Sequence, residues 1–235
     1  MSFDFSAMGT ALGAALKYTP VTLLLAVEAL AAGILFGTLI ALTRVYNIRI
    51  LDRVSQVFVV TVKGIPLILI LLVINIVFSQ GFDSLAGILH LGVRSKDVDP
   101  IFLAFAGLTI FSSATISEIV RGSLLSVDKG QYEASYAAGM TKVQTLRRIV
   151  LPQAVTVATP MLCNTFIGLL KGSSLVFILS ITDLYNAAQI TATANYCFLE
   201  ATVAAAIVYW AICALIERLS VVLERTLSAH LAKTS

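Results

Sequence analysis

The stretch DKGQYEASYAAGMTKVQTLRRIVLP, residues 128–152, is polar and basic, whereas almost everything on either side of it is apolar. Within it, three residues separate Glu133-Ala134-Ser135 from Gly139, and nine further residues lead to Ile149-Val150-Leu151-Pro152. A gapped pattern with this many fixed positions rarely arises by chance. The stretch therefore indicates a specific recognition element more strongly than an ordinary amphipathic connector between two apolar segments.

The local sequence of this stretch predicts two short helices joined by a sharp turn. Asp128 or a neighbour can cap the start of the first helix, and Gly139 can take the positive φ that a sharp turn requires. Thr141 and Gln144 have the spacing of a capping box for the second helix. The expected product is a rigid knob, and we use this name for residues 128–151.

One face of the first helix is expected to be apolar. Tyr132, Tyr136 and Met140 follow one another at four-residue steps, so they would share one side of a helix. An apolar stripe of this kind suits the cleft of another protein. We therefore expect the knob to bind a partner through this stripe.

The composition identifies a membrane protein. Hydrophobic residues make up 58% of the chain and charged residues 12%, compared with about 25% charged residues in an ordinary globular domain. The 235 residues have room for about five or six spans of roughly 20 residues each, and no room for a large soluble domain. The cysteines are scattered in apolar surroundings and the histidines are isolated, so we expect no disulfide and no metal site.

We expect one all-α integral membrane domain over residues 1–235, with five transmembrane helices. The spans are expected at about residues 18–43, 54–78, 100–120, 152–171 and 197–215. A loop at residues 122–151 carries the knob. Residues 173–196 are too short and too polar to cross the membrane comfortably, so we expect a loop there, with a short interfacial helix at 174–181.

The basic residues set the expected orientation in the membrane. Arg44, Arg49 and Arg53 follow the first span, further cations lie in the knob, and Arg218 and Arg225 follow the last span. Loops rich in Lys and Arg stay in the cytoplasm. The N-terminus is therefore expected outside and the C-terminus inside. A sixth crossing within the 173–196 segment would place the C-terminal cations outside, against this bias.

The frame around Glu133 and Gly139 resembles the EAA loop of the membrane subunits of ATP-binding-cassette (ABC) importers. Further segments extend the resemblance over nearly the whole chain and narrow it to permeases for polar amino acids, of the histidine, glutamine and cystine type. They are Lys63-Gly64-Ile65-Pro66-Leu67, Glu118-Ile119-Val120-Arg121-Gly122, Leu151-Pro152-Gln153-Ala154, and Asn164-Thr165-Phe166-Ile167 with Lys171-Gly172-Ser173-Ser174-Leu175. The resemblance implies the transmembrane domain of a type I ABC importer in a bacterial inner membrane.

The resemblance also implies the partners. In this family the EAA loop forms a coupling helix that docks into a groove of an ATP-hydrolysing subunit. The residues that carry this role over to the present chain are Gln131, Tyr132, Glu133, Ala134, Ser135, Tyr136 and Gly139. The implied assembly has two ATP-binding subunits, a second permease subunit that is identical or different, an extracytoplasmic solute-binding protein and an amino-acid substrate in a lipid membrane. It involves no nucleic acid.

The chain is expected to contain no catalytic site of its own. Its nearest approach to a phosphate-binding loop, residues 168–174, has the lysine and the glycine in the wrong order and at the wrong spacing. ATP and magnesium are therefore expected in the partner subunit, and the chain itself is expected to need no cofactor.

A break in the second span is the first candidate for the substrate pathway, the alternative being a simple packing kink. Lys63, Gly64 and Pro66 interrupt an apolar run, and unpaired backbone groups at membrane depth are tolerated only against protein or a polar cavity. Lys63 lies about nine residues, or ~14 Å, from the cytoplasmic end of its span, and Glu28 about ten residues, or ~15 Å, from the outer end of the first span. Because unpartnered charges in a membrane are costly, we expect these two charges either to pair or to flank the pathway.

The fourth span and the residues after it supply the second candidate. The residues concerned are Asn164, Thr165, Lys171, Gly172, Ser173 and Ser174. Asn164 and Lys171 are two helical turns apart and share a face, so their amide and ammonium groups can meet one substrate. The structural alternatives are an interhelical hydrogen bond for Asn164 and a snorkelling side chain for Lys171.

This span departs from the family that the chain resembles in a way that bears on the substrate. Thr165 and Gly172 stand where acidic residues are common in that family. The loss of two negative charges from a small cavity weakens any preference for a cationic side chain. We therefore expect a neutral or zwitterionic amino acid as the substrate, with cystine as the specific candidate.

An ion-driven secondary carrier is the alternative function. Such a carrier would use an intramembrane acid such as Glu28 and would need no basic knob. A purely structural membrane protein would need no such frame either. The frame in residues 128–152 therefore favours the ATP-driven importer.

Overall fold

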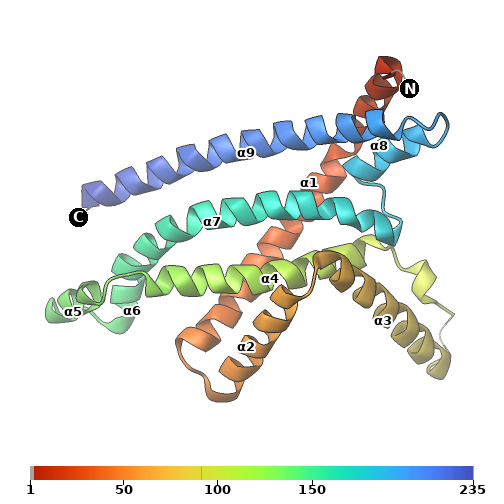
Figure 1. Ribbon diagram of the computed structural model, residues 1–235. Coiled ribbons are helices and arrows are strands. Elements are labelled where there is room, and N and C mark those ends of the chain that lie inside the picture. Colours follow the sequence, from red (N-terminus) through yellow and green to blue (C-terminus); the bar gives the residue numbers. More distant parts are fainter. Residues whose placement is uncertain (1–2, 91, 235) are drawn as a thin grey trace.

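The computed structural model describes residues 3–90 and 92–234, and within them all regular structure is helical. The α-helices are α1 (Phe5–Val45), α2 (Arg49–Gly64), α3 (Leu67–Ile88), α4 (Ile101–Leu125), α5 (Lys129–Ala137), α6 (Lys142–Thr145), α7 (Leu151–Gly172), α8 (Leu184–Ala192) and α9 (Phe198–Thr234). The short connecting helices are the 3₁₀ helices η1 (Ser95–Asp97) and η3 (Ser173–Leu179) and the π-helix η2 (Leu146–Val150). In Figure 1 the knob and the C-terminal end of α9 lie at one end of an elongated bundle, and the N-terminus lies at the other.

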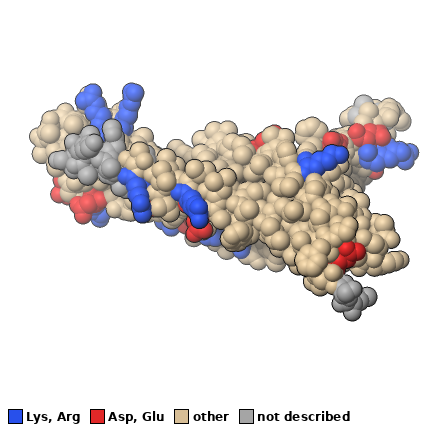
Figure 2. Space-filling view, turned by 90° about the horizontal axis from the view of Figure 1, so that it is seen from above, with Lys and Arg blue, Asp and Glu red and all other residues tan. Residues whose placement is uncertain are grey.

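Five helical segments are long and apolar enough to cross a membrane. They are Phe5–Val45, Leu67–Ile88, Ile101–Leu125, Lys142–Leu179 and Phe198–Thr226. Charged side chains lie mainly toward the two ends of the molecule and leave a largely uncharged area between them (Figure 2). Such an area suits a hydrocarbon core, in which charges are costly. The predicted all-α membrane fold with five transmembrane helices is confirmed.

The first helix is longer than the sequence predicts. α1 has 41 residues, or about 61 Å, which is roughly twice the ~30 Å of a hydrocarbon core. It begins at Phe5 instead of near residue 18, because the Asp4 carboxylate caps it by accepting hydrogen bonds from the N–H groups of Ser6 and Ala7. Alanine-rich packing against α8 and α9 stabilises its N-terminal part.

The predicted break in the second span is present and complete. α2 ends at Gly64 and α3 begins at Leu67, and Pro66 between them has no N–H to continue the helix. The two helices meet at a sharp angle (Figure 1). The structure thus replaces the single span expected at 54–78 by two helices. The second of these continues to Ile88, where a loop was expected.

The segment 173–196 contains a helix that was not predicted from its polar composition. The interfacial helix expected at 174–181 corresponds to η3, but α8 follows it where the sequence predicts a loop. The buried Asp183 carboxylate caps α8 by accepting a hydrogen bond from the Asn186 N–H (2.9 Å), and it accepts another from the Tyr209 hydroxyl (3.2 Å). The alanines of α8 pack against α1 and α9, so tertiary contacts stabilise this short helix.

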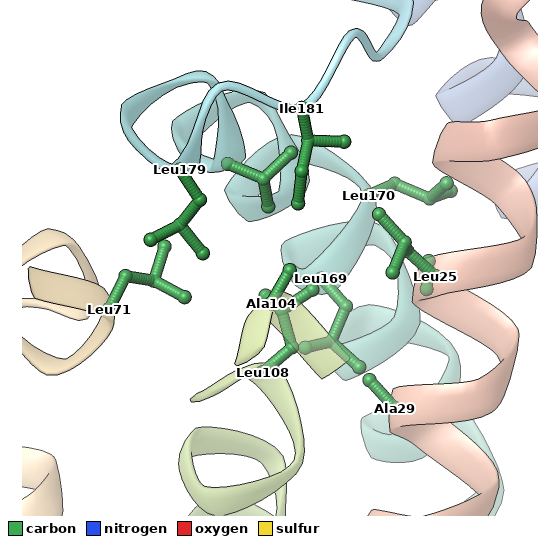
Figure 3. Packing of buried hydrophobic residues seen from close by; sticks show 11 residues of the cluster. Leu25, Ala29, Leu71, Ala104, Leu108, Leu169, Leu170, Leu179 and Ile181 are labelled. Carbon is green, nitrogen blue, oxygen red and sulfur yellow. The ribbon is translucent and has the colours of Figure 1, made fainter. Parts of the chain in front are cut away.

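The main hydrophobic core joins α1, α3, α4, α7 and η3 (Figure 3). Leu25, Leu71, Leu108 and Leu169 come from four different helices and are fully buried. Leu71 lies in the second turn of α3, just beyond the break, and Leu169 lies in the last turn of α7. The core therefore holds the break beside the end of α7.

Small residues let α1 and α4 approach closely. A Cβ atom at Gly37 would lie 2.9 Å from the carbonyl oxygen of Ser113, closer than side-chain carbons come to such atoms. The Ser112 hydroxyl donates a hydrogen bond to the Ala29 carbonyl oxygen (2.8 Å). Only glycine fits at such a contact, and the two helices form a close-packed pair.

Candidate functional site: the knob and the face of α7

The two short helices predicted for the knob are present, with the predicted caps. The Asp128 carboxylate accepts a hydrogen bond from the Gly130 N–H (2.6 Å) at the start of α5, and Gly139 has a φ of +80°. Thr141 and Gln144 form the capping box of α6, with the Thr141 N–H donating to Gln144 Oε1 (2.8 Å) and the Gln144 N–H to Thr141 Oγ1 (3.3 Å). Local hydrogen bonds thus define the knob, as its sequence predicts.

A buried hydroxyl pair holds the two helices of the knob together. Ser135 is buried, its hydroxyl donates to the Tyr132 carbonyl oxygen (2.8 Å), and it lies 3.0 Å from the hydroxyl of Thr145. Since Thr145 belongs to α6, a large side chain at position 135 would push the two helices apart. This contact explains why a small residue follows Glu133-Ala134.

The predicted apolar stripe is wrong as a single surface. Tyr132 packs against the protein's own core, in a cluster built around Val127, Val150 and Ala154. Tyr136 is 46% exposed, and Met140 lies beyond the Gly139 turn because α5 ends at Ala137. Burial raises the pKa of the Tyr132 phenol, and the nearby Tyr136 and Tyr46 raise it further, so Tyr132 stays neutral. Tyr132 is therefore an anchor of the knob.

The outward face of the knob is polar and basic. The exposed residues of α5 include Gln131, Glu133, Ala134 and Tyr136. Lys142, Arg147 and Arg148 are exposed on the second half of the knob, and Glu133 is the only carboxylate within α5. A surface of this kind suits a partner groove that is partly acidic and that also accepts a carboxylate.

The knob is continuous with the fourth membrane-crossing segment. α6 passes through the single π-turn η2 into α7, so that residues 142–179 form one helical segment. π-turns of this kind are common at functional sites. A force applied to the knob is therefore delivered directly to α7.

Three charged side chains connect the last turn of α1 to the C-terminal third of α4. Glu118 forms ion pairs with Arg44 of α1 and, at 3.2 Å, with Arg121 one turn further along α4. The sequence indicates the pair of Glu118 with Arg121 by its three-residue spacing. Arg44 is distant in the sequence, and only the structure identifies it as a partner. We refer to Arg44, Glu118 and Arg121 as the clamp.

An exposed stripe on α7 contains the two predicted polar residues. It consists of Val157, Met161, Asn164, Gly168 and Lys171, at alternating spacings of four and three residues. Such spacing places all five on one side of the helix. Val157, Met161 and Gly168 were not predicted, because their spacing from Asn164 is shared by many apolar residues and only their exposure in the fold distinguishes them. This stripe is exposed in the described chain.

The residues around this stripe are less available to a ligand. The Thr165 hydroxyl donates to the Met161 carbonyl oxygen (2.9 Å), the buried Ser173 to Leu170 (2.8 Å), and Ser174 to Lys171 (2.7 Å). Among the described residues, none forms a hydrogen bond with the side chain of Asn164 or Lys171. These two are thus the polar groups that the stripe offers.

Gly172 connects the two candidate parts of the pathway. A Cβ atom at this position would lie 2.8 Å from Cδ2 of Leu67, the first residue of α3. The end of α7 therefore packs directly beside the exposed Lys63, Gly64 and Pro66 of the break. An acidic side chain at position 172 would have to displace Leu67.

The structure does not bring Glu28 and Lys63 together. Glu28 is exposed in an open hollow between α1 and α4, which is lined by Leu24, Glu28, Ala31, Ile101, Phe102 and Phe105. Lys63 is exposed at the end of α2, and no ion pair joins the two within the described ranges. The assignment of Glu28 as an intramembrane functional charge stays a prediction.

The sequence of the chain matches one known protein family. The family of inner membrane components of binding-protein-dependent transport systems matches residues 33–229. The chain is a member of this family. The predicted resemblance to permease subunits of ABC importers is thereby confirmed, and the permease itself is not an enzyme.

Relatives of the permease cover most of its length. It is 33% identical to a probable amino-acid ABC transporter permease protein, PatM, of Vibrio harveyi, over 97% of this chain and 98% of the relative. It is 36% identical to the L-cystine transport system permease protein TcyL of Bacillus subtilis, over 92% and 88%. It is 30% identical to the glutamine transport system permease protein GlnP of Escherichia coli, over 89% and 90%.

Solved structures share the fold of the permease. A crystal structure of an amino acid ABC transporter with histidines superposes with a TM-score of 0.82 at 28% identity, covering 96% of this chain and 100% of that chain. The MetNI methionine ABC transporter in an inward-facing conformation has a TM-score of 0.68 at 19% identity, which shows the fold alone. The permease thus has the fold of a type I ABC importer transmembrane domain and is a multi-pass protein of the inner membrane.

Proposed function

We propose that this permease is the membrane subunit of an ATP-driven importer for an amino acid, and that its knob takes mechanical work from an ATP-hydrolysing partner. The observation that carries the proposal is the construction of the knob. It is rigidly capped, it is anchored through Tyr132, and it continues as one helical segment into α7. A connector without a mechanical role needs none of these features.

The proposed assembly has two permease subunits related by a two-fold axis and one ATP-binding subunit beneath each knob, where ATP and magnesium bind. An extracytoplasmic solute-binding protein delivers the substrate. The exposed stripe on α7 supports a pathway at or near the axis, because a stripe of five unpartnered residues in one chain is available to a second copy or a homologue.

The proposed orientation places the knob in the cytoplasm and the N-terminus outside. It rests on the basic residues of the knob and of the segment after α1, which lie toward the same end of the bundle in Figure 1. When ATP closes the two ATP-binding subunits, the two knobs approach each other. Each α7 then moves with its knob, and the pathway changes from inward-facing to outward-facing.

The proposed substrate is a neutral or zwitterionic amino acid, with cystine as the specific candidate. The relatives TcyL and TcyB carry the name of L-cystine transport permeases and are each 36% identical to this chain. The α7 stripe carries an amide and an ammonium group and no carboxylate, while Thr165 and Gly172 add no negative charge. Lys171 can attract the carboxylate of an amino acid, and a cationic side chain would find no counter-charge there.

Uptake by the reconstituted complex tests the proposal. The permease, its ATP-binding subunit and its solute-binding protein are reconstituted in liposomes without thiol reductants, which would cleave cystine. We expect cystine uptake to require ATP on the knob side and to exceed arginine and lysine uptake. Uptake driven by a proton or sodium gradient without ATP would contradict the importer. Preferential uptake of arginine or lysine would contradict only the substrate assignment.

Substitutions on α7 test the pathway. We expect Asn164→Leu and Lys171→Gln each to raise the KM of uptake roughly fivefold, because the first removes a hydrogen bond and the second a charge, each worth about 1 kcal/mol to the bound substrate. The rate at saturating substrate is expected to change little. Lys96→Gln, at an exposed lysine of η1, is the matched control. An unchanged KM in both α7 variants would exclude this stripe from the pathway.

A further inference from the structure

The clamp joins the last turn of α1 to α4, about two turns before α4 ends at Leu125. Arg44 lies in the last turn of α1, and Glu118 accepts hydrogen bonds from Arg44 through Oε1 and from Arg121 through Oε2. The side chains of Arg44 and Glu118 are only 14% and 28% exposed. One carboxylate therefore holds guanidinium groups from two helices.

The position of the clamp connects it to the knob. α4 ends at Leu125, and Asp128 caps α5 only three residues later. Leu124 of α4 and Tyr132 of the knob pack against the same buried cluster, which contains Val127 and Val150, the last residue of η2. A displacement of the knob consequently acts on the end of α4, and about two turns earlier on the same helix the clamp ties α4 to α1.

The clamp is not needed merely to hold α1 against α4. Glycine and serine contacts already hold α1 to α4 along their length, and partly exposed ion pairs add little to stability. The clamp also leaves Arg121 Nε buried without an acceptor among the described residues, which costs stability. What the clamp adds is a directional contact at one end of the pair, where movement of the knob enters.

We propose that the clamp makes α1 move together with the knob. α1 is the longest helix of the permease, and its N-terminal part packs against α8 and α9 at the far end of the bundle. With the clamp in place, a movement of the knob displaces two helices. It displaces α7 because the two are continuous, and it displaces α1 through the ion pair of Glu118. Arg44, Glu118 and Arg121 are thus positioning residues that carry movement to the outer end. This inference rests on the proposed ATP-driven import.

Loss of the clamp is expected to lower transport without lowering ATP hydrolysis. Without the clamp, the knob still docks on the ATP-binding subunit and ATP is still hydrolysed, but α1 no longer follows. A purely structural role would instead lower the amount of assembled complex, so that transport and ATP hydrolysis would fall in proportion. The number of substrate molecules moved per ATP is the quantity that distinguishes the two roles.

A charge-exchange cycle in the complete reconstituted complex tests the clamp. Uptake of an equimolar mixture of amino acids including cystine is measured by mass spectrometry, together with ATP hydrolysis in the same liposomes. We expect Glu118→Gln, Arg44→Glu and Glu118→Arg each to lower transport per ATP about fivefold. The triple variant Arg44→Glu with Glu118→Arg and Arg121→Glu exchanges every charge of the clamp, and it is expected to return to within about twofold of the wild type because each pair attracts again. Glu217→Gln, at an exposed carboxylate of α9 outside any ion pair of the described residues, is the matched control.

Each outcome decides the proposal. Unchanged transport per ATP in the single variants, or a triple variant that assembles without recovery, would overturn the clamp. If a single variant fails to assemble, the triple variant decides in the same way. A wild-type complex that moves no amino acid with ATP would instead contradict the proposed function, so the two failures are distinguishable.

Discussion

Glu133→Lys is expected to abolish ATP-driven uptake while the permease itself remains folded. Glu133 is exposed on α5 and makes no ion pair within the part of the chain that the structure describes, so its loss costs the fold little. It is the only carboxylate within α5, and the rest of the outward face is neutral or basic. A reversed charge at a desolvated contact costs about 2–5 kcal/mol, which corresponds to a loss of at least ~30-fold in binding.

The measurement has two parts. Uptake into liposomes reports transport, and co-purification of the ATP-binding subunit reports docking of the knob. Glu224→Lys makes the same charge change at an exposed position of α9 and serves as the control. Normal uptake and normal co-purification with Glu133→Lys would contradict the role of the knob as the docking element.

The knob was predictable because its structure is encoded locally. The Asp128 cap, the positive φ of Gly139 and the capping box of Thr141 with Gln144 each involve residues within three positions of one another. The break before Leu67 is local in the same sense, since proline prevents a helix from continuing whatever surrounds it. Signals of this type are read from sequence without knowledge of tertiary contacts.

The features that the sequence did not reveal depend on contacts between distant residues. Arg44 meets Glu118 across 74 positions, and α8 is stabilised by packing against α1 and α9. The N-terminal third of α1 lacks the hydropathy of a span, and it is helical because other helices cover its alanines. Tyr132 points into the protein because the end of α4 and the start of α7 approach α5, which no helical periodicity records.

The exposed stripe on α7 was predictable only in part. The spacing of Asn164 and Lys171 predicts a shared face, and the structure places both on an exposed side of α7. The sequence does not identify Val157, Met161 and Gly168 as members of this side, because α7 carries apolar residues on every face. Exposure distinguishes them, and exposure is a property of the folded chain.

Gly139→Val is the second substitution with a large expected effect, because it acts on the turn that aims the knob. At a φ of +80°, a β-branched residue is strained by about 1–3 kcal/mol. The turn holds two hydrogen bonds, from the Gly139 N–H to the Tyr136 carbonyl oxygen and from the Met140 N–H to the Ser135 carbonyl oxygen, each 3.0 Å long. Relief of the strain breaks these bonds and turns α5 away from α6. We expect uptake to fall at least about tenfold.

Gly139→Asn separates backbone strain from side-chain crowding. A Cβ atom at position 139 meets no other atom within 4 Å, so both substitutions fit sterically. Asparagine tolerates positive φ and valine does not, so we expect the asparagine variant to keep uptake within about threefold of the wild type. Equal losses in the two variants would mean that the outer surface of the turn contacts the ATP-binding subunit and that the backbone geometry is secondary. A large loss with valine alone would show that the angle between α5 and α6 determines how well the knob transmits force.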